Sequence, residues 1–460
     1  MQMSAVRRLQ PRLPSAALAL VTTVTVAIGA PGVSGAGAAP SSAHTPTFAA
    51  SSAPVPAKLQ CPSGTATGAP GVSATQINVG AISTLSGPIS AGFASFVPGV
   101  EAYFDTVNAK GGVDGRKINL AYNLNDTGTQ TRFETETHTV IDQDHAFAVF
   151  ASSYWFNPTY FTSTCTPTYG YNVTGDWTTA PNLFAAGGSV ETDKTIVPAI
   201  AYLIKKTKAK SVAVIAYNVS TSSTACQATI NGLQGAGYDV SYSDLELTPI
   251  TPDVTPDVQR MRSAGTGFIV SCMTVDGNIA MARALKEYSL HVKQLWLTVP
   301  DQAVLDSDSG LMQGVYFNNA NVPLAAAKRF PGTYPGLDAY LVAMKRYEPA
   351  YIGDGLAMHG WESAALLVTG IKAAGKKFTQ ASLVEATNRL TEFTAGGIIA
   401  PMNWTETHSK VVAPFCSAFV EVQGHNYEPA FTRGKQVYLC FSETVRNPEP
   451  GPVKPGTPGP

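Results

Sequence analysis

The apolar positions of residues 77–126 change their period twice. Residues 77–82 form a short run rich in branched side chains, which predicts a parallel strand covered on both faces. From residue 93 to residue 110, apolar side chains recur three and four positions apart, as on the buried face of a helix. Two glycines then precede a second apolar run at residues 117–122. The stretch therefore predicts a strand–helix–strand unit, whose crossover should be right-handed.

The same alternation of apolar runs and amphipathic stretches continues along the chain. Further strands are expected at residues 146–150, 211–217, 267–272, 294–297 and 314–317. Helices are expected at residues 131–143, 189–207, 224–235, 257–264, 276–288, 334–347 and 353–374. Strands separated by helices predict an α/β fold with doubly wound parallel sheet. Residues 410–422 and 427–440 predict a terminal β-hairpin.

Composition narrows the classes of protein. The chain has 460 residues, of which 44% are hydrophobic, so a sizeable core is expected. At about 150 residues per domain, this length predicts two or three domains. Lys plus Arg number 31 and Asp plus Glu number 32, and this balance argues against a nucleic-acid-binding surface, which is normally basic.

The N-terminus has the pattern of a targeting segment. Basic residues up to Arg12 precede an apolar run at residues 16–28, and small residues follow it. We therefore expect a cleaved signal peptide over residues 1–38 and a flexible leader over residues 39–74. A membrane anchor is the alternative, but the run is too short and threonines interrupt it. No later stretch of the sequence is apolar over about 18 residues, so the mature protein is not expected to span a membrane.

Six cysteines, an even number in an exported chain, predict disulfide bonds. The preferred pairs are Cys61–Cys165, Cys226–Cys272 and Cys416–Cys440. The last pair joins two neighbouring strand-like runs, whereas the other two are chosen among the many connectivities that six cysteines allow. A metal site or a catalytic thiol is the alternative. It is disfavoured because no two cysteines form a Cys-x-x-Cys pair and the histidines are scattered.

The amino-acid identities in residues 77–126 are more informative than the spacing of the apolar positions. INVGAISTLSG at residues 77–87 is followed by YFDTVNAKGGVDGRKINL at residues 103–120 and by Asn125-Asp126. This sequence resembles the opening of the type I periplasmic solute-binding proteins, the leucine/isoleucine/valine-binding group of ABC transporter receptors. Later segments that resemble the family follow in the family's order, at residues 212–215, 314–316 and 400–404.

The resemblance covers most of residues 75–440 and implies two Rossmann-like lobes joined by a multi-strand hinge. By this resemblance the first lobe comprises residues 75–187 and 320–397, and the second comprises residues 188–319 and 398–445. The remaining residues, 446–460, are rich in proline and glycine and are expected to form a disordered tail.

The resemblance also implies a function. The protein is expected to be an extracellular solute-binding protein that captures a small polar ligand in a cleft between its lobes for ABC transport. The ligand would be an amino acid or a related amide or carboxylate, and the implied partner is an ABC transporter permease. No cofactor is expected. An enzyme is not expected either, because the sequence has no Gly-x-Ser-x-Gly, His-Glu-x-x-His or Walker motif.

Two alternatives stay open. The first is a secreted ligand-sensing or surface-interaction protein on the same fold, and the second, weaker one is a secreted hydrolase. The first cysteine, Cys61, lies far beyond the N-terminal apolar run. The lipid-modified cysteine that tethers many such receptors is therefore not expected, and free secretion slightly favours the sensing alternative.

Polar groups suited to an amino acid follow the strand predicted at residues 146–150. A ligand carboxylate needs hydroxyl or backbone N–H donors, and Ala151, Ser152 and Ser153 supply both in principle. In the family this place corresponds to a serine-bearing loop, and a second loop corresponds to Thr174. For Ser152 and Ser153, capping of a helix is an equally good interpretation.

The ammonium group of an amino acid needs an anion. By the resemblance this is Asp301, for which a plain turn aspartate is the alternative. Ser86, in the Leu-Ser-Gly turn after the first strand, is expected at the mouth of the cleft.

Two departures from the family affect the walls of the expected cleft. Residues 218–223 lack a tyrosine that faces the cleft in many members, and Cys272 stands where another is frequent. Trp155 or Trp177 is expected to replace the lost aromatic wall, although core packing is the simpler interpretation for the aromatic residues of 154–182. The family scaffold is therefore predicted more firmly than the ligand.

Overall fold

The strand–helix–strand unit predicted at residues 77–126 is present in the structure. It consists of β1 (Gln76–Ser83), the short helix η2 (Ser90–Gly92), α1 (Phe96–Ala109) and β2 (Lys117–Asn125). Pro98 occupies the first turn of α1, where a missing N–H removes no helical hydrogen bond. Gly112 has a φ of +78°, and a Cβ there would lie 2.0 Å from the carbonyl oxygen of Arg116. The turn into β2 therefore requires glycine.

The computed structural model describes residues 57–87, 90–171, 175–186, 197–249, 253–407, 415–442, 444–451 and 453. The predicted signal peptide, residues 1–38, lies outside the described residues, and so does Thr174. No helix among the described residues is long and apolar enough to cross a bilayer.

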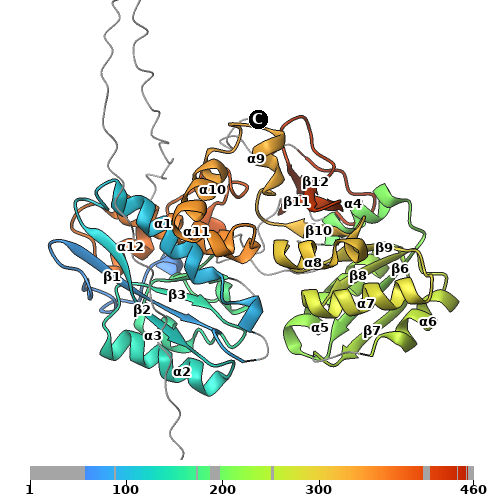
Figure 1. The fold of residues 1–460 in the computed structure, drawn as a ribbon. Coiled ribbons are helices and arrows are strands. Elements are labelled where there is room, and N and C mark those ends of the chain that lie inside the picture. Colours follow the sequence, from blue (N-terminus) through green and yellow to red (C-terminus); the bar gives the residue numbers. More distant parts are fainter. Residues whose placement is uncertain are drawn as a thin grey trace, which may run out of the picture. The chain divides into compact units, whose positions relative to one another are not determined.

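The first lobe is built on a five-stranded parallel sheet with the order β2-β1-β3-β4-β5. Its further elements are η1 (Ala57–Leu59), α2 (Gln130–His138), the π-helical turn η3 (Thr139–Gln143), β3 (Val149–Ser152), α3 (Thr159–Thr164), β4 (Thr168–Tyr171), η4 (Gly175–Thr178) and β5 (Leu183–Ala186). Helix α1 lies on one face of this sheet, and α2 and α3 lie on the other (Figure 1). Their buried side chains pack against the strands.

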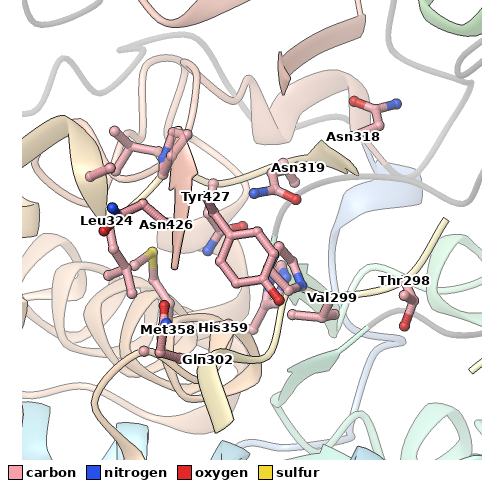
Figure 2. Close-up of a pocket in the computed structure, with 18 of the residues that line it drawn as sticks. Thr298, Val299, Gln302, Asn318, Asn319, Leu324, Met358, His359, Asn426 and Tyr427 are labelled. Carbon is pink, nitrogen blue, oxygen red and sulfur yellow. The ribbon is translucent and has the colours of Figure 1, made fainter. Parts of the chain in front are cut away.

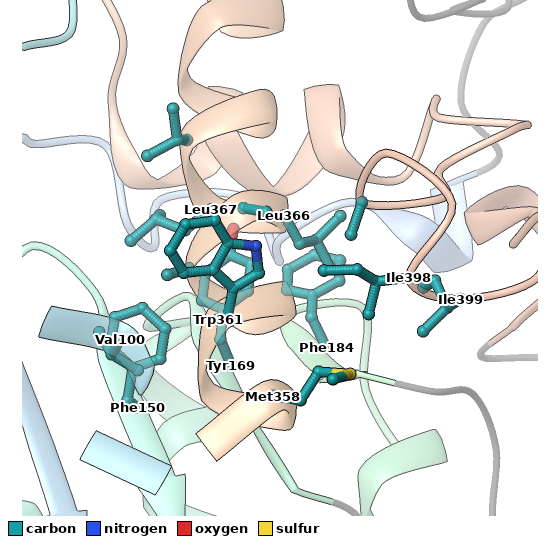
Figure 3. Close-up of a cluster of buried hydrophobic side chains, with 14 of the residues drawn as sticks. Val100, Phe150, Tyr169, Phe184, Met358, Trp361, Leu366, Leu367, Ile398 and Ile399 are labelled. Atoms are coloured by element: carbon teal, nitrogen blue, oxygen red, sulfur yellow. The ribbon is translucent and has the colours of Figure 1, made fainter. Parts of the chain in front are cut away.

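Later helices complete the first lobe. They are α10 (Pro335–Tyr347), the short helix η5 (Pro349–Tyr351), α11 (Gly355–Ala374) and α12 (Gln380–Thr387). Every residue of α11 from 356 to 371 is buried, because the helix packs on α1 and on the sheet. Figure 3 shows the centre of this core, where side chains of α11 meet side chains of α1 and of the strands. Its labelled members include Val100, Phe150, Tyr169, Phe184, Trp361, Leu366 and Leu367.

The second lobe is built on a larger sheet with the order β12-β11-β10-β9-β8-β6-β7, and β13 also pairs with β11. Its strands are β6 (Ser211–Tyr217), β7 (Asp239–Leu247), β8 (Phe268–Cys272), β9 (Lys293–Trp296), β10 (Tyr316–Asn319), β11 (Phe415–Gln423), β12 (Asn426–Pro429) and β13 (Tyr438–Phe441). β6 to β10 pair in parallel, whereas β11 pairs antiparallel with β10, β12 and β13.

Helices cover both faces of the second sheet as well. They are α4 (Val197–Thr207), α5 (Ser220–Gly235), α6 (Thr255–Ser263), α7 (Val275–Glu287) and α8 (Gln302–Met312). Buried side chains of α4 and α5 form one core cluster with the sheet, and those of α6, α7 and α8 form two others. Helices between parallel strands in both lobes confirm the doubly wound α/β class predicted from the sequence.

Two segments pair where the chain passes between the elements of one lobe and those of the other. We call residues 320–324 and 395–403 the crossing segments. Asn321 forms an isolated β-bridge with Ile399, and the Val322 N–H donates to the Ile398 carbonyl at 2.7 Å. The buried hydroxyl of Tyr438 in β13 also donates to the Ile398 carbonyl. The short helices α9 (Ala325–Arg329) and α13 (Trp404–Thr407) directly follow the two segments.

The three disulfides predicted from the sequence are confirmed. They join Cys61 to Cys165, Cys226 to Cys272 and Cys416 to Cys440. Cys416 and Cys440 lie directly opposite each other in β11 and β13, as the hairpin-like sequence pattern suggested.

The chain is folded over a longer stretch than the sequence predicted. Leu59, within the expected flexible leader, is 1% exposed, and the backbone N–H groups of Gln380 and Ala381 donate to Gly68 and Ala66. The leader prediction is therefore wrong for residues 57–74, because α12 supplies them with hydrogen bonds.

Part of the predicted C-terminal tail also makes defined contacts. Gly451 forms a β-bridge with Cys440, and Glu449 forms an ion pair with Lys205 at 2.7 Å. Arg433 donates to the carbonyl of Pro450 at 2.6 Å. These contacts explain why the chain does not leave the second lobe at residue 446, where the sequence pattern ends.

Candidate functional site

The carboxyl ends of β1, β2 and β3 meet at one edge of the first sheet, where a buried acid lies. Asp126, which follows β2, is 0% exposed. Its carboxylate accepts hydrogen bonds from the Thr84 hydroxyl at 3.0 Å and from the Ser153 hydroxyl. It also accepts from the backbone N–H of Gly128 at 2.8 Å, while Ser153 accepts from the Trp155 N–H at 2.9 Å. The network joins the ends of three neighbouring strands.

This network changes the role expected of the serines. Ser153 already gives its hydroxyl proton to Asp126, so it is not a free donor for a ligand carboxylate. Ser152 is 0% exposed and donates towards the Phe93 carbonyl at 3.5 Å, and Ala151 is equally buried within β3. Ser86 is exposed and accepts a hydrogen bond from the Asn125 amide at 2.9 Å. In this structure the predicted donors of the first lobe support the strand ends.

Trp177 belongs to the core. It is 2% exposed and stacks on Phe156 with 4.0 Å between ring centroids and 6° between ring planes. Its indole also lies over Gly170 of β4, where a Cβ would lie 2.6 Å from the indole ring and 2.0 Å from the Ala151 carbonyl oxygen. The prediction that Trp177 lines a cleft is therefore wrong, because the absence of a side chain at Gly170 lets the ring pack onto the sheet.

Cys272 has a structural role at the end of β8. Its sulfur is bonded to Cys226 of α5, and its carbonyl accepts a hydrogen bond from the Ser222 hydroxyl at 2.5 Å. Beside it, the hydroxyls of Tyr217 and Thr274 are hydrogen-bonded at 2.9 Å. The disulfide therefore fixes the first half of α5 to the carboxyl edge of the second sheet.

Asp301 is the N-cap of α8. Its carboxylate accepts from the backbone N–H groups of Ala303 at 2.8 Å and Val304 at 3.1 Å, which are otherwise unpaired in the first turn of a helix. Its backbone pairs with Asp354, which caps α11 in the same way through the Leu356 N–H at 2.9 Å. Two helices, one from each lobe, thus begin side by side, and each has its own aspartate.

The cap role predicts the effect of Asp301→Asn. Asparagine caps a helix about as well as aspartate, so the free energy of unfolding should change by less than about 1 kcal/mol. Affinity for an amino-acid ligand should change little, because the carboxylate is already engaged by α8. Calorimetric titration and thermal melting check both expectations. A sharp loss of affinity at unchanged stability would instead make Asp301 the partner of a ligand ammonium group.

A cavity of about 350 Å³ lies next to these helix starts. Its walls come from the loop between β9 and α8, the end of β10 with the first crossing segment, the start of α11, and β12. Much of the lining is apolar, including Leu297, Val299, Pro300, Leu324 and Met358. Figure 2 shows Tyr427 of β12 together with His359 and Val299, which line the same cavity.

A buried network of hydrogen bonds stands behind one part of the wall. His359, which lines the cavity and is 8% exposed, is joined through Nδ1 to Glu362 Oε1 at 2.7 Å. The other oxygen of Glu362 accepts from Asn321 Nδ2 at 2.9 Å. Glu362 is 0% exposed, and burial raises the pKa of its carboxyl, while His359 and Asn321 act in the opposite direction. The network links α11 to the first crossing segment.

Two asparagines of the cavity wall have unpaired amide atoms. Asn321 is 7% exposed, and its Oδ1 has no hydrogen-bond partner among the described residues. The buried Oδ1 and Nδ2 of Asn318 also have none within the described part of the chain. Unpaired buried amide groups are costly, typically by about 1–3 kcal/mol each. A polar ligand or water in the cavity would remove this cost.

The sequence pattern did not point to these residues. His359 and Glu362 lie three positions apart in an apolar stretch that predicts a buried helix, and such a pair in a core helix is a usable signal. Asn321 and Tyr427 gave no signal, because they join the cavity from segments more than a hundred residues apart. Of the predicted site residues that the structure describes, none is among those that line the cavity, although Asp301 lies next to Pro300 and Gln302, which do.

Comparison with known proteins identifies the scaffold. The model of the periplasmic binding protein family matches residues 76–426. No curated protein sequence matches the chain.

Solved structures share the fold at low sequence identity. A branched-chain amino acid ABC transporter protein from Thermus thermophilus, solved with bound valine, is 15% identical with a TM-score of 0.67, and the match covers 79% of this chain and 98% of that one. A fatty acid ABC transporter substrate-binding protein from Thermomonospora curvata is 15% identical with a TM-score of 0.65, covering 86% and 100%. A solute-binding protein of R. palustris in complex with benzoate is 15% identical with a TM-score of 0.61, covering 77% and 95%. With two doubly wound lobes, paired crossing segments and a family match over most of its length, the chain belongs to the periplasmic binding protein family.

Proposed function

We propose that the protein is a solute receptor of an ABC transporter, which captures a small ligand in the cavity beside the crossing segments and delivers it to a permease. The ligand is an amino acid or a related amide or carboxylate. The observation that carries this proposal is the cavity itself. Its volume of about 350 Å³ falls in the range of roughly 300–1,000 Å³ that small-molecule sites occupy, and its mostly apolar wall has a few polar groups.

The position of the cavity supports a receptor. Its lining combines His359 of α11, which belongs to the first lobe, with Tyr427 of β12, which belongs to the second. A ligand that contacts elements of both lobes favours the conformations in which those elements are together. Binding can thereby be sensed by a permease without any chemical step, so no catalytic residue is required.

Solved structures of similar fold contain ligands of more than one chemical class, which agrees with a proposed ligand class that includes both amino acids and carboxylates. The structures of similar fold carry ligands as different as valine and benzoate. The scaffold alone therefore does not select the ligand, and the side chains of the cavity must do so.

A second candidate function is a freely secreted sensing protein on the same fold. The observation that favours it is the bond between Cys61 and Cys165. A cysteine in a disulfide cannot carry a lipid, so Cys61 does not tether the protein to a membrane. Three disulfides agree with an extracytoplasmic location, where such bonds persist. Both functions need the same cavity.

A thermal-shift screen tests the proposal. Amino acids, amides, ureas, aromatic acids and short peptides are added to the mature protein, and its melting temperature is measured. A ligand at about a hundred times its Kd should stabilise the protein by about 2.7 kcal/mol. We expect at least one of these classes to do so.

A matched pair of variants locates the binding. Leu324→Trp fills the cavity from its half-buried wall, whereas Val342→Trp adds the same ring on α10, where Val342 is 70% exposed. The first variant should abolish the ligand-induced shift and the second should keep it. A shift that survives Leu324→Trp would place the ligand elsewhere, and a screen without any shift would refute the receptor function.

A further inference from the structure

The wall of the cavity contains unusually little charge for a site that would hold an amino acid. Among the described residues that line it there is no Lys, Arg, Asp or Glu, and its titratable side chains are His359, Tyr171 and Tyr427. An ammonium group taken out of water needs an anion beside it, because an isolated buried charge is very costly. Asp301 is engaged by α8, and Glu362 is covered by His359 and Asn321. A zwitterion therefore finds no counter-ion for its ammonium group.

His359 can provide the opposite charge. Nδ1 of His359 is hydrogen-bonded to Glu362, so Nε2 is the ring nitrogen that is left for a ligand. No described residue is bonded to Nε2. When the imidazole is protonated, Nε2–H is a charged donor, and the buried carboxylate of Glu362 stabilises that charge. The ring lies on the cavity wall, of which Tyr427 is also a part (Figure 2).

Asn321 adds a second recognition group close to the first. Its Nδ2 and the Nδ1 of His359 both bond to the one carboxylate of Glu362, so the amide and the imidazole are neighbours. With Nδ2 fixed by Glu362, the unpaired Oδ1 needs a hydrogen-bond donor. A ligand hydroxyl next to a ligand carboxylate would serve Asn321 and His359 together.

We propose, on the basis of the receptor function above, that the ligand is a small 2-hydroxy monocarboxylic acid and that its binding is coupled to proton uptake. The carboxylate accepts from Nε2–H of protonated His359, and the hydroxyl donates to Oδ1 of Asn321. Glu362 is a positioning residue that holds the imidazole and balances its charge. The apolar wall holds the remaining body of the acid.

The titratable groups that face His359 and Glu362 from other elements do not compete for the proton. Tyr171 of β4 lies 4.9 Å from His359 between ring centroids, Tyr427 of β12 shares the cavity wall, and Tyr438 of β13 faces Glu362. Burial raises the pKa of Tyr427 and of Tyr438, so both phenols stay protonated and uncharged. The nearby aspartates 301 and 354 cap α8 and α11.

The pH dependence has a definite sign. A bound carboxylate stabilises the form of the His359–Glu362 pair that holds more protons, so protons are taken up on binding. Affinity must then fall as the pH rises, by at most about tenfold per pH unit for one proton. A neutral ligand would show no such slope.

Titration calorimetry with matched probes tests the proposal. The probes are 2-hydroxy-4-methylpentanoate, leucine and 4-methylpentanamide, which share one apolar body and differ in the polar end. They are titrated at about pH 6 and about pH 8. We expect the hydroxy acid to bind at least about tenfold more tightly than leucine, with weaker binding at the higher pH. In buffers of different ionisation enthalpy, the measured heat should report proton uptake. Equal or tighter binding of leucine or of the amide, or a flat pH profile, would overturn the proposal.

Variants identify the groups responsible. His359→Gln should weaken the hydroxy acid at least about tenfold and remove its pH dependence. Glu362→Gln should keep the ring but shift the pH profile. His291→Gln, at an exposed position outside the cavity, should change neither. Circular dichroism and the melting temperature without ligand check that each variant folds. The pH dependence of the wild-type protein tests the proposal even where a variant fails to fold.

The outcomes separate this proposal from the receptor function. A ligand of another class that is lost in Leu324→Trp but is insensitive to pH and to His359→Gln would overturn the hydroxy-acid proposal and keep the receptor. If no compound of the screen binds at all, both fail.

Discussion

Gly99→Ala and Gly360→Ala should each lower the free energy of unfolding of the first lobe by about 3 kcal/mol, the upper part of the usual range for overpacking. A Cβ at Gly99 in α1 would lie 1.8 Å from the carbonyl oxygen of Ala357 in α11. A Cβ at Gly360 in α11 would lie 1.9 Å from the carbonyl oxygen of Phe96 in α1. The two helix backbones thus approach each other at a reciprocal pair of glycines. Backbone atoms cannot move aside as the end of a flexible side chain can, so the helices must separate.

A glycine without neighbours provides the control. Gly235, at the end of α5, would have no heavy atom within 4 Å of an added Cβ. Gly235→Ala should therefore leave stability unchanged or raise it by up to about 1 kcal/mol, because alanine loses less backbone entropy than glycine. Calorimetric melting of the three variants measures the difference. If Gly99→Ala and Gly360→Ala melt like the control, α1 and α11 do not pack as closely as described.

The close approach also has a functional consequence. His359 immediately precedes Gly360, and Ala357 lies three residues before Gly360. A displacement of α11 at these contacts therefore displaces the cavity wall. Either glycine variant should therefore weaken ligand binding as well as stability, without any change in a residue that touches the ligand.

Loss of the Cys61–Cys165 bond should have the largest effect among the three disulfides. The chain-entropy model relates stabilisation to the length of the closed loop, and this bond spans 104 residues against 24 for Cys416–Cys440. Replacement of both partners by alanine should lower the free energy of unfolding by about 4–5 kcal/mol for the first pair and about 3–4 kcal/mol for the second. The long loop contains most of the first sheet, so its unfolded chain gains the most freedom.

Limited proteolysis and calorimetry check this prediction together. Without the bond, the segment around Leu59 keeps its hydrogen bond from Asn388 at 3.2 Å but loses its covalent link. Cleavage near residues 57–74 should therefore become faster in the Cys61→Ala/Cys165→Ala variant than in the Cys416→Ala/Cys440→Ala variant. A smaller loss of stability for the longer loop would contradict the entropic account.

The elements that the sequence predicted well are those whose signal is local. The run at residues 211–217 coincides with β6, in which every residue is buried, so its side chains must be apolar on both faces. β7 was missed because it is an edge strand whose residues are mostly half-buried or exposed, which leaves no continuous apolar run. β4 was missed because its four residues include Gly170, whose role is to make room for Trp177.

The candidate site was predicted less well than the fold. Ser153 was expected to meet a ligand, but Asp126 from the neighbouring strand takes its hydroxyl proton. Asp301 was expected to hold an ammonium group, but the first turn of α8 takes its carboxylate. In both cases a partner inside the protein satisfies the group, and the partner of Ser153 lies too far away in sequence for any local pattern to show.

The sequence by itself determined the α/β class, the order of most strands and helices and the family resemblance, because periodicity and short motifs express local burial and turn requirements. Among the cysteine pairs it provided a local reason only for Cys416–Cys440, which joins two neighbouring strand-like runs. The tertiary structure decided which polar groups remain available. His359, Glu362, Asn321 and Tyr427 come from α11, a crossing segment and β12, and they meet through packing of distant segments. Whether a buried polar atom is paired or open to a ligand depends on all of its neighbours in space, and this is the physical reason why the cavity could be recognised only in the folded chain.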